Sequence, residues 1–483
     1  MVFSDLFFLF AFLPAFLICY MLASLLDKKL AHDPLHPRFT ARNIALVIFS
    51  LLFYSWGEPV YVFLMVISVA INYFVGRAIC KSTTHRKQAL IVGLVANIAI
   101  ICSFKYLGFL AGILSSIGLG VPDPHIALPI GISFYTFQSI SYLVDVYRND
   151  SPAQERYVDL LLYISMFPQL IAGPIVRYGT VANEINNRRV SASDISDGAF
   201  RFLIGLGKKV IIANQLSEIS DQFLATEGLE NLSTTGAWLG IFAFTLQIYF
   251  DFSGYSDMAI GIGRCLGFHF CENFNHPYMS RTITEFWRRW HMSLGSFFRD
   301  YVYIPLGGNR AHQFLNILIV WALTGLWHGA SWNFVLWGLF FAVILILEKT
   351  FILKFMNRLP RVVGIIYTMT LVAFGFTIFY FDDMQALREY YRAFFATNGN
   401  FSDFTVQSAI FDNFWLWITA IVFCFPVRDY VGRLHCRLLE PRHTNAAMAL
   451  STVWRIAMAV GILLLSITLL IGATNNAFLY TRF

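Results

Sequence analysis

The chain carries a series of apolar runs that are long enough, or nearly long enough, to cross a lipid bilayer. A helix of about 20 residues spans the hydrocarbon layer. Runs of this kind lie at 6–26, 43–57, 60–79, 89–110, 127–147, 198–213, 237–262, 314–330, 332–348, 362–381, 411–426 and 452–472. Because a backbone in lipid must satisfy its own polar groups, each run is predicted to be a helix. The sequence therefore predicts an all-α polytopic membrane protein with about 11–12 transmembrane helices.

Composition and flanking residues refine this prediction. Hydrophobic residues make up 57% of the chain and charged residues only 13%, which is far from the average of soluble proteins. The first run has no basic segment before it and is followed by Lys28 and Lys29, so it is expected to remain as a span rather than to be cleaved as a signal peptide. Segment 158–176 contains Pro168 and the Gly173-Pro174 pair. A re-entrant element is therefore expected there.

Basic residues follow every second run, and the intervening loops are acidic or neutral in balance. Lys28 and Lys29 follow the first run, arginines crowd the 264–310 segment, and acidic residues mark the 214–236 stretch. The positive-inside rule then places both termini outside the cytoplasm. The same rule accounts for the net charge of +6, so no nucleic-acid partner is expected.

Metal and nucleophile motifs are absent from the sequence. The seven cysteines are scattered, without a CxxC pair, and neither HExxH nor GxSxG occurs. The sequence therefore predicts no disulfide framework and no metal site.

Polar side chains interrupt two of the apolar runs, and such residues are costly in lipid unless they serve a purpose. Gln138, Ser141 and Asp145 recur at the spacing of one helix face, so they either join helices by hydrogen bonds or line a cavity. Asp251 and Asp257, together with Ser253 and Ser256, interrupt the apolar run at 237–262. They could act as paired acids in proton transfer, but fixing helix ends and orienting a neighbouring base is favoured.

A third polar cluster extends from Glu285 to Asn333 and contains His291 and His328. His328 lies in a tryptophan-rich apolar run, where Gly325 and Gly329 would let a substrate or another backbone approach closely. A neutral imidazole can take a proton from an attacking hydroxyl, an effect of roughly 10²–10⁴ in rate. The alternative for a membrane histidine is an interhelical hydrogen bond.

Six motifs along the chain carry a resemblance to a known family. They are GISFYTFQSISYLVDVYR (131–148), FPQLIAGPIVR (167–177), DFSGYSDMAIG (251–261), FWRRWHMSL (286–294), PLGGNR (305–310) and LTGLWHGASWNFVLWG (323–338). Together they resemble the membrane-bound O-acyltransferase family, and within it the bacterial branch that acetylates alginate, other exopolysaccharides or peptidoglycan. The resemblance covers nearly the whole chain as one membrane domain, 1–483. We expect peripheral N-terminal spans at 1–124, a catalytic core at 125–350 and C-terminal spans at 351–483.

The resemblance implies a transmembrane tunnel around the catalytic site and assigns roles to individual residues. The family's catalytic histidine falls on His328, and its second polar position falls on His291. Residues expected to line the tunnel or to orient the histidines are Asp251, Asp257, Gln138 and Asn333. Arginines expected to bind the phosphates of a donor at the cytoplasmic side are Arg281, Arg288, Arg289, Arg299 and Arg310, although an ordinary positive-inside loop would explain several of them.

The last residues, Phe478 to Phe483, resemble an aromatic C-terminal motif of the same branch, in which a tyrosine carries the acyl group. Tyr480 would be that tyrosine, and Thr481 departs from the usual aromatic residue of the motif. The alternative is an aromatic anchor at the membrane interface.

The resemblance implies an O-acetyltransferase in the bacterial inner membrane. We expect acetyl-CoA to be the donor substrate, with no permanently bound cofactor, and a periplasmic or membrane-anchored esterase-like protein to be the partner that modifies the polysaccharide. Two alternatives remain open: a transporter or flippase for an activated sugar or lipid, and a D-alanyl transferase supplied by an acyl carrier protein.

Overall fold

The structure is a computed structural model whose regular secondary structure, in the residues it describes, is entirely helical. These are all residues except 31–39, 123, 172, 357, 428–429, 431–444, 474–477 and 480–483. No strand occurs among the described residues, as expected of a chain whose backbone lies in lipid. The predicted all-α class is confirmed.

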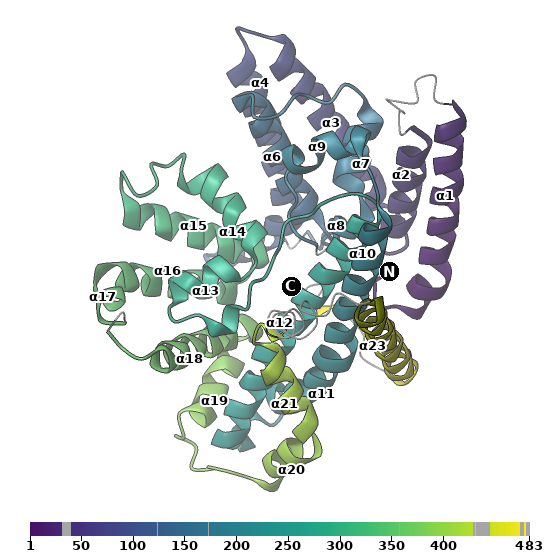
Figure 1. Ribbon diagram of the computed structural model, residues 1–483. Coiled ribbons are helices and arrows are strands. Elements are labelled where there is room, and N and C mark those ends of the chain that lie inside the picture. The colour runs from purple at the N-terminus through teal and green to yellow at the C-terminus, as the bar shows by residue number, and fades with distance from the viewer. Residues whose placement is uncertain are drawn as a thin grey trace.

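The N-terminal third forms a bundle of helices on one side of the molecule (Figure 1). Its helices are η1 (Phe8–Phe12), α1 (Leu13–Leu30), α2 (Thr40–Ser55), α3 (Tyr61–Lys81), α4 (Arg86–Ile101), η2 (Cys102–Tyr106), α5 (Leu107–Ser116), α6 (Ile132–Arg148), α7 (Tyr157–Ser165), α8 (Phe167–Leu170) and α9 (Tyr178–Asn187).

The middle of the chain supplies the central helices and one flank of the molecule (Figure 1). These helices are α10 (Ala192–Gly207), η3 (Lys208–Ala213), α11 (Asn214–Leu224), η4 (Leu229–Asn231), α12 (Thr234–Cys265), η5 (Pro277–Met279), α13 (Ile283–Arg289), α14 (Met292–Phe298), η6 (Arg299–Tyr303), α15 (Gln313–His328), α16 (Trp332–Leu347), η7 (Glu348–Ile352), α17 (Leu353–Met356) and α18 (Arg361–Tyr380).

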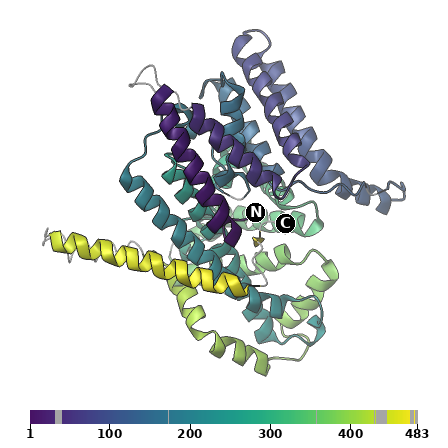
Figure 2. The same ribbon diagram turned by 90° about the vertical axis from the view of Figure 1, so that its right-hand side faces the viewer.

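The C-terminal part closes one end of the molecule and adds a peripheral helix. It consists of α19 (Met384–Phe394), α20 (Phe404–Asp412), α21 (Phe414–Phe423) and α23 (Asn445–Gly472). Figure 2 shows α23 projecting from the body, where it packs on α10. The short described segment at residues 478–479 returns to the interior, since Phe478 is 1% exposed.

The 32-residue helix α12 is the axis around which the other elements pack. The Ser233 hydroxyl accepts a hydrogen bond from the Gly236 N–H and so begins the helix. Side by side with α12 runs α10, and glycines allow the close approach: a Cβ on Gly254 would lie 2.7 Å from the Gly205 carbonyl oxygen. The result is a helix pair held backbone to backbone through the centre of the protein.

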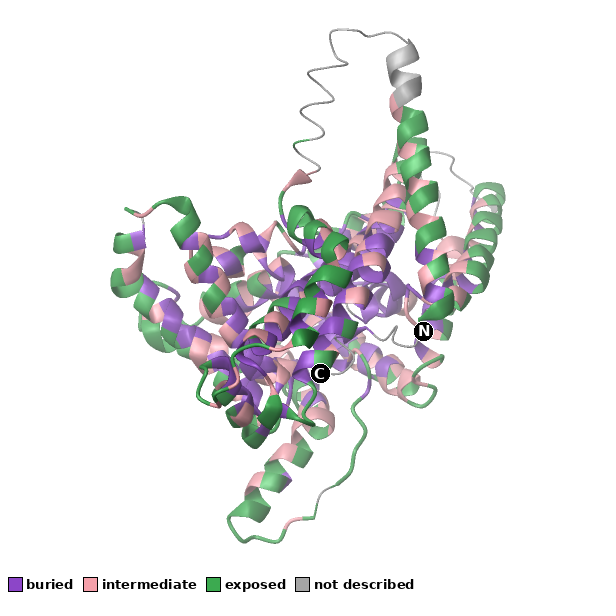
Figure 3. Ribbon diagram, turned by 90° about the horizontal axis from the view of Figure 1, so that it is seen from below, coloured by how far each residue is buried: buried purple, intermediate pink, exposed green. Residues whose placement is uncertain are grey.

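Two large hydrophobic clusters meet at the middle of α12. Figure 3 shows the buried residues concentrated in the interior of the molecule. Residues of α12 up to Phe250 pack with α16, α18 and α19. From Phe252 onward, α12 packs with the N-terminal bundle. Asp251 therefore lies where the two clusters join.

Six helices among the described residues are long and apolar enough to cross a membrane, and the bent pair α20–α21 is a seventh if it is one span. They match the runs expected at 6–26, 60–79, 89–110, 332–348, 362–381, 452–472 and, for the bent pair, 411–426. The runs at 43–57 and 314–330 form the shorter apolar helices α2 and α15. The other three expected runs lie in α6, α10–η3 and α12, and each of these contains charged residues. The multi-pass class is confirmed, and a count of about 12 crossings stays a prediction.

The segment expected to be re-entrant is short, bent and buried. Helix α7 ends at Ser165, and α8 covers only Phe167–Leu170. Residues 159–171 are all buried. Neither helix is long enough to cross a bilayer.

Candidate active site

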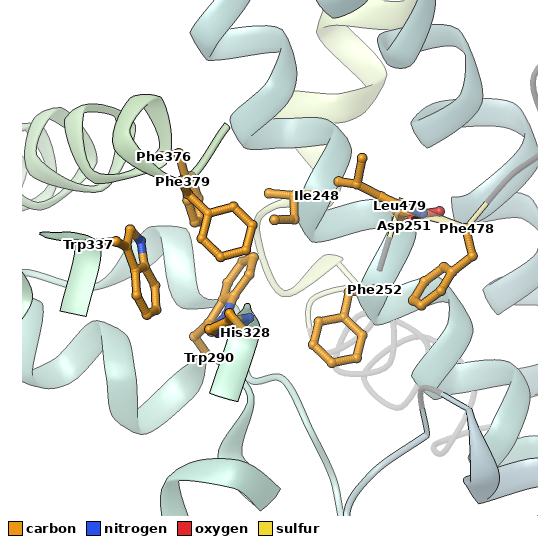
Figure 4. A pocket seen from close by; sticks show the side chains of 10 residues that line it. All are labelled: Ile248, Asp251, Phe252, Trp290, His328, Trp337, Phe376, Phe379, Phe478 and Leu479. Atoms are coloured by element: carbon orange, nitrogen blue, oxygen red, sulfur yellow. Dashed lines mark hydrogen bonds between the residues drawn. The ribbon is translucent and has the colours of Figure 1, made fainter. Parts of the chain in front are cut away.

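His328 lies at a small interior cavity between α12, α15, α16 and α18. The cavity has a volume of about 30 Å³. Its walls are apolar and largely aromatic, and Figure 4 shows Trp290, Trp337, Phe379 and His328 on one side of it. Asp251 and Phe478 line the opposite side. A tunnel through the membrane at this cavity stays a prediction.

The local sequence places His328 at the end of α15. The helix ends at His328 because Gly329 adopts an extended conformation. Its imidazole packs edge-to-face on Trp337 and on Phe379, both with ring centroids at 5.0 Å. Gly325 and Gly329 permit a close approach, as expected, but the group that approaches them is Phe334 of the next helix. These glycines therefore build the α15–α16 hairpin that presents His328.

His291 is buried next to the same group of rings. It precedes α14 with a left-handed backbone, φ 42°, and is 3% exposed. The centroid of its ring lies 4.7 Å from that of Phe252 and 5.6 Å from that of Trp327. The Trp327 ring also lies 4.7 Å, centroid to centroid, from the ring of His328. Trp327 thus lies against both histidines. His291 does not itself line the cavity.

The orientation of His291 is set by Asn273, which sequence reasoning missed. His291 Nδ1 donates to Asn273 Oδ1 at 3.0 Å. The remaining nitrogen, Nε2, is buried and has no hydrogen-bond partner among the described residues. Burial lowers the pKa of His291 to about 3, so its imidazole is neutral at physiological pH. Nε2 is therefore a bare acceptor.

Asn273 ties several elements to His291. Its Oδ1 also accepts from the Ser293 hydroxyl at 2.9 Å, and its Nδ2 donates to Ser256 of α12 at 3.1 Å. The residue is 1% exposed. A neutral asparagine in a loop segment carries no charge or periodicity signal, so only the folded contacts identify it.

The two aspartates of α12 are held in ion pairs with different partners. Asp251 and Lys209 of η3 are 2.6 Å apart and are both nearly inaccessible, with side chains 2% and 5% exposed. Asp257 pairs with Arg201 at 2.8 Å and with Lys208 at 2.7 Å. These pairs explain how α10–η3 carries three cations through the interior. They agree with the favoured interpretation, in which the aspartates fix helices.

Asp251 also holds the C-terminal segment in the cavity wall. Its Oδ2 accepts a hydrogen bond from the Leu479 N–H at 2.8 Å. Phe478 packs on Tyr255 with ring centroids at 4.7 Å. Tyr480, the expected acyl relay, lies outside the described residues.

Gln138 and Asn333 do not line the cavity. Gln138 is 1% exposed, and neither atom of its amide has a hydrogen-bond partner among the described residues. On the same stripe of α6, Asp145 accepts from the Tyr301 hydroxyl at 2.6 Å. Asn333 donates through Nδ2 to the Phe379 carbonyl at 3.1 Å. It thereby ties the start of α16 to the backbone of Phe379, whose ring packs on His328, and its orienting role stays a prediction.

The arginines expected to bind a donor differ in how far they are available. Arg281 donates to the carbonyls of Met356 and Leu359, both at 3.2 Å. Arg289 pairs with Glu285 at 2.8 Å. By contrast, Arg288 and Arg310 are exposed. The structure therefore leaves these two for an external anion, and the donor-binding role of the set stays a prediction.

Arg299 belongs to a second charged cluster, around Asp300. Arg299 and Arg177 approach the Asp300 carboxylate at 2.6 Å and 2.7 Å. Burial alone would raise the pKa of Asp300, but hydrogen bonds from Arg299 and Arg177 outweigh it and lower the pKa. Asp300 therefore offsets part of the positive charge of this cluster.

Comparison with known proteins identifies the family of the chain. The membrane-bound O-acyltransferase family matches residues 156–385, which include both histidines. The protein named "Probable alginate O-acetylase AlgI" in Pseudomonas aeruginosa is 41% identical over 413 residues, covering 82% of this chain and 75% of the relative. The peptidoglycan O-acetyltransferase of Helicobacter pylori is 33% identical over 435 residues, covering 83% and 80%. The teichoic acid D-alanyltransferase of Bacillus subtilis is 28% identical over 286 residues, covering 54% and 72%. The chain therefore belongs to the membrane-bound O-acyltransferase family and is a multi-pass membrane acyltransferase.

Proposed function

We propose that the chain is an O-acetyltransferase that moves an acetyl group across the bacterial inner membrane for the O-acetylation of a cell-envelope or exported polysaccharide. The polymer would be alginate-like or peptidoglycan. Two relatives with at least 33% identity over more than four fifths of this chain are named for acetylation of alginate and of peptidoglycan. The D-alanyltransferase relative matches only 54% of this chain. Acetyl transfer is therefore favoured over D-alanyl transfer.

The observation that carries the proposal is the imidazole of His328 on the wall of a small apolar cavity. A volume of about 30 Å³ holds roughly one or two waters. It suits a two-carbon acyl group better than a long acyl chain. Because the walls are aromatic, water is excluded from the thioester, which protects it from hydrolysis.

The reaction follows from this arrangement. The donor is acetyl-CoA, bound from the cytoplasmic side where Arg288 and Arg310 are exposed. His328 takes the proton of an acceptor hydroxyl as the oxygen attacks the thioester carbonyl. The new C–O bond forms, the C–S bond breaks, and the thiolate leaves with the proton from the imidazolium. His291, with its bare Nε2, orients His328 or holds the donor.

The acetyl group then passes to the outer side, where both termini lie in the topology expected from charge. The acceptor in this proposal is the hydroxyl of Tyr480, because its neighbours Phe478 and Leu479 line the cavity with His328. A periplasmic or membrane-anchored esterase-like partner would take the acetyl group from there to the polymer.

The test is acetyl transfer by the His328→Ala variant. Purified protein in lipid vesicles is given labelled acetyl-CoA, and label transferred to an acceptor is counted. We expect a loss of about 10²-fold or more, because the general base is removed, while the variant is inserted and as thermally stable as the parent. His85→Ala is the matched control, since His85 is exposed and does not line the cavity.

Full transfer by His328→Ala would refute the proposal. A transporter or flippase has no need of this imidazole. That alternative would be supported if the parent protein transferred no acyl group and the His328→Ala variant still moved substrate across the membrane. Label transfer from a charged acyl carrier protein, and none from acetyl-CoA, would support the D-alanyl alternative.

A further inference from the structure

The last turn of α15, which carries His328, ends inside the protein, where its carbonyl groups need partners. A helix leaves its final four carbonyls without intrahelical donors. In α15 the Gly325 carbonyl accepts from the Gly329 N–H at 3.4 Å. The carbonyls of Leu326, Trp327 and His328 remain, and in an apolar interior unsatisfied carbonyls are costly.

Two consecutive residues of another helix supply those donors. The Tyr106 hydroxyl donates to the Leu326 carbonyl at 2.8 Å. Lys105 Nζ donates to the Trp327 carbonyl and, at 3.3 Å, to the His328 carbonyl. All three carbonyls of the last turn are therefore satisfied from one neighbouring segment.

Lys105 has a third acceptor, the Ser133 hydroxyl at the start of α6, at 3.4 Å. Three acceptors match the three N–H donors of an ammonium group. A cation at a helix C-terminus also interacts favourably with the helix dipole. The position thus satisfies both the charge and the donors of a lysine that lies within the apolar helix Arg86–Ser116.

The backbone of that helix is adapted to the contact. Residues Cys102–Tyr106 form the π-helical turn η2 inside the otherwise α-helical span. Side chains of consecutive residues point about 100° apart on an α-helix. A π-turn holds more residues per turn, so it brings Lys105 and Tyr106 closer to a common direction, and such turns are frequent at functional sites.

We propose that Lys105, assisted by Tyr106, is a positioning residue for catalysis: it locks the last turn of α15 and so fixes the direction in which His328 faces the cavity. This inference rests on the proposed role of His328. A purely structural lysine would join two helices without affecting the reaction once the protein is folded. A positioning lysine affects kcat, the rate at which the bound donor reacts.

The variants are Lys105→Met, which keeps length and removes the charge and donors, Lys105→Arg, which keeps both, and Tyr106→Phe. Lys81→Met is the matched control, because Lys81 is an exposed lysine at the end of α3. Ser103→Ala controls for substitution within η2, since among the described residues the Ser103 hydroxyl donates only to the Ala99 carbonyl one turn earlier. Each protein is compared in lipid nanodiscs for kcat, KM for acetyl-CoA, thermal unfolding and amide hydrogen exchange of residues 322–331.

For Lys105→Met we expect kcat to fall by about 10- to 100-fold, because a misplaced catalytic group loses rate steeply. KM for acetyl-CoA should change by less than about twofold, since donor binding is untouched. Amide exchange in residues 322–331 should become faster. Lys105→Arg should recover most of the rate, Tyr106→Phe should show a smaller loss, and both controls should match the parent.

The outcomes separate this inference from the proposed function. If His328→Ala keeps full activity, the proposed function fails and the positioning role fails with it. If His328→Ala is inactive while Lys105→Met keeps the parent's kcat, or loses activity only in proportion to unfolded protein, only the positioning role is overturned. Equal losses in Lys105→Arg and Lys105→Met would also overturn it.

Discussion

At the scale of single residues, the site combines one histidine on a cavity wall with a second histidine outside the wall, which a hydrogen bond to Asn273 orients. His328 reaches the cavity, whereas His291 is held through Nδ1 by Asn273. The bond from Nδ1 leaves Nε2 as the bare nitrogen, because a neutral imidazole carries one proton. The tautomer of His291 is therefore decided by an amide that sequence reasoning did not single out.

The Asn273→Ala variant tests this arrangement. It leaves the His291 N–H and the Ser293 hydroxyl without their acceptor, and each such buried loss costs about 1–3 kcal/mol. We expect a lower thermal unfolding temperature and an activity reduced by about tenfold. Asn275→Ala is the control, because the Asn275 side chain is exposed. Unchanged activity and stability in Asn273→Ala would show that His291 needs no such support.

The low pKa of His291 predicts how this residue contributes to the pH dependence of the rate. Burial places this pKa at about 3, so the folded protein carries a neutral His291 from about pH 5 to pH 8. Any fall in rate on acidification within that window then comes from another group. A plot of activity against pH for Asn273→Ala should therefore have the same shape as that of the parent protein, with a lower activity at every pH.

At the scale of elements, glycines decide how closely the central helices approach. Gly205 and Gly254 face each other across the α10–α12 contact, and a Cβ on either would lie within 2.7 Å of the other's carbonyl oxygen. This contact brings Lys208 and Lys209, which directly follow α10, to Asp257 and Asp251. Helix packing and buried charge pairing therefore depend on the same small residues.

The Gly254→Ala variant should separate the two helices. A methyl group at 2.7 Å from a backbone oxygen requires a shift of the helix, and overpacking of this kind costs about 1–3 kcal/mol. We expect a lower unfolding temperature in detergent and in nanodiscs. The control is Gly461→Ala on α23, where a Cβ would meet nothing within 4 Å. Its unfolding temperature should stay the same or rise slightly, because alanine has a higher helix propensity than glycine. Equal stability of the two variants would contradict the packing argument.

At the scale of the whole molecule, the C-terminal segment joins the two hydrophobic clusters at the cavity. Phe478 belongs to the cluster of the N-terminal bundle, and Leu479 belongs to the other cluster. The Asp251 carboxylate holds the segment through the Leu479 N–H. Residues near the end of the sequence thus become neighbours of His328 on α15.

If Tyr480 is the acyl relay, label from acetyl-CoA should appear as an ester on its hydroxyl. Mass spectrometry of the C-terminal peptide should find acetylated Tyr480 in the parent protein and none in Tyr480→Phe or His328→Ala. Transfer to an added acceptor should fall in parallel. An unlabelled Tyr480 together with full transfer in Tyr480→Phe would show that the acceptor takes the acetyl group directly.

The sequence by itself determined the all-α multi-pass class and the family, and it predicted the two histidines as site residues. These follow from local properties: apolar length against bilayer thickness, and ionisable residues within apolar runs. Family motifs placed His328 and His291, and the paired glycines beside His328 correctly indicated a close approach, although by Phe334 rather than by a substrate.

Only the tertiary structure decided which residues support the histidines and which arginines remain available. Asn273 meets His291, Lys105 meets the end of α15, and Arg281 turns to backbone carbonyls, each through contacts between distant segments. These partners come together only when distant segments pack. The free energy of each buried hydrogen bond depends on the distance and burial of its two groups, which the order of residues along the chain does not reveal. Lys105 lies in the apolar run 89–110, where sequence reasoning did not single it out, and only the carbonyls that it meets point to the proposed role.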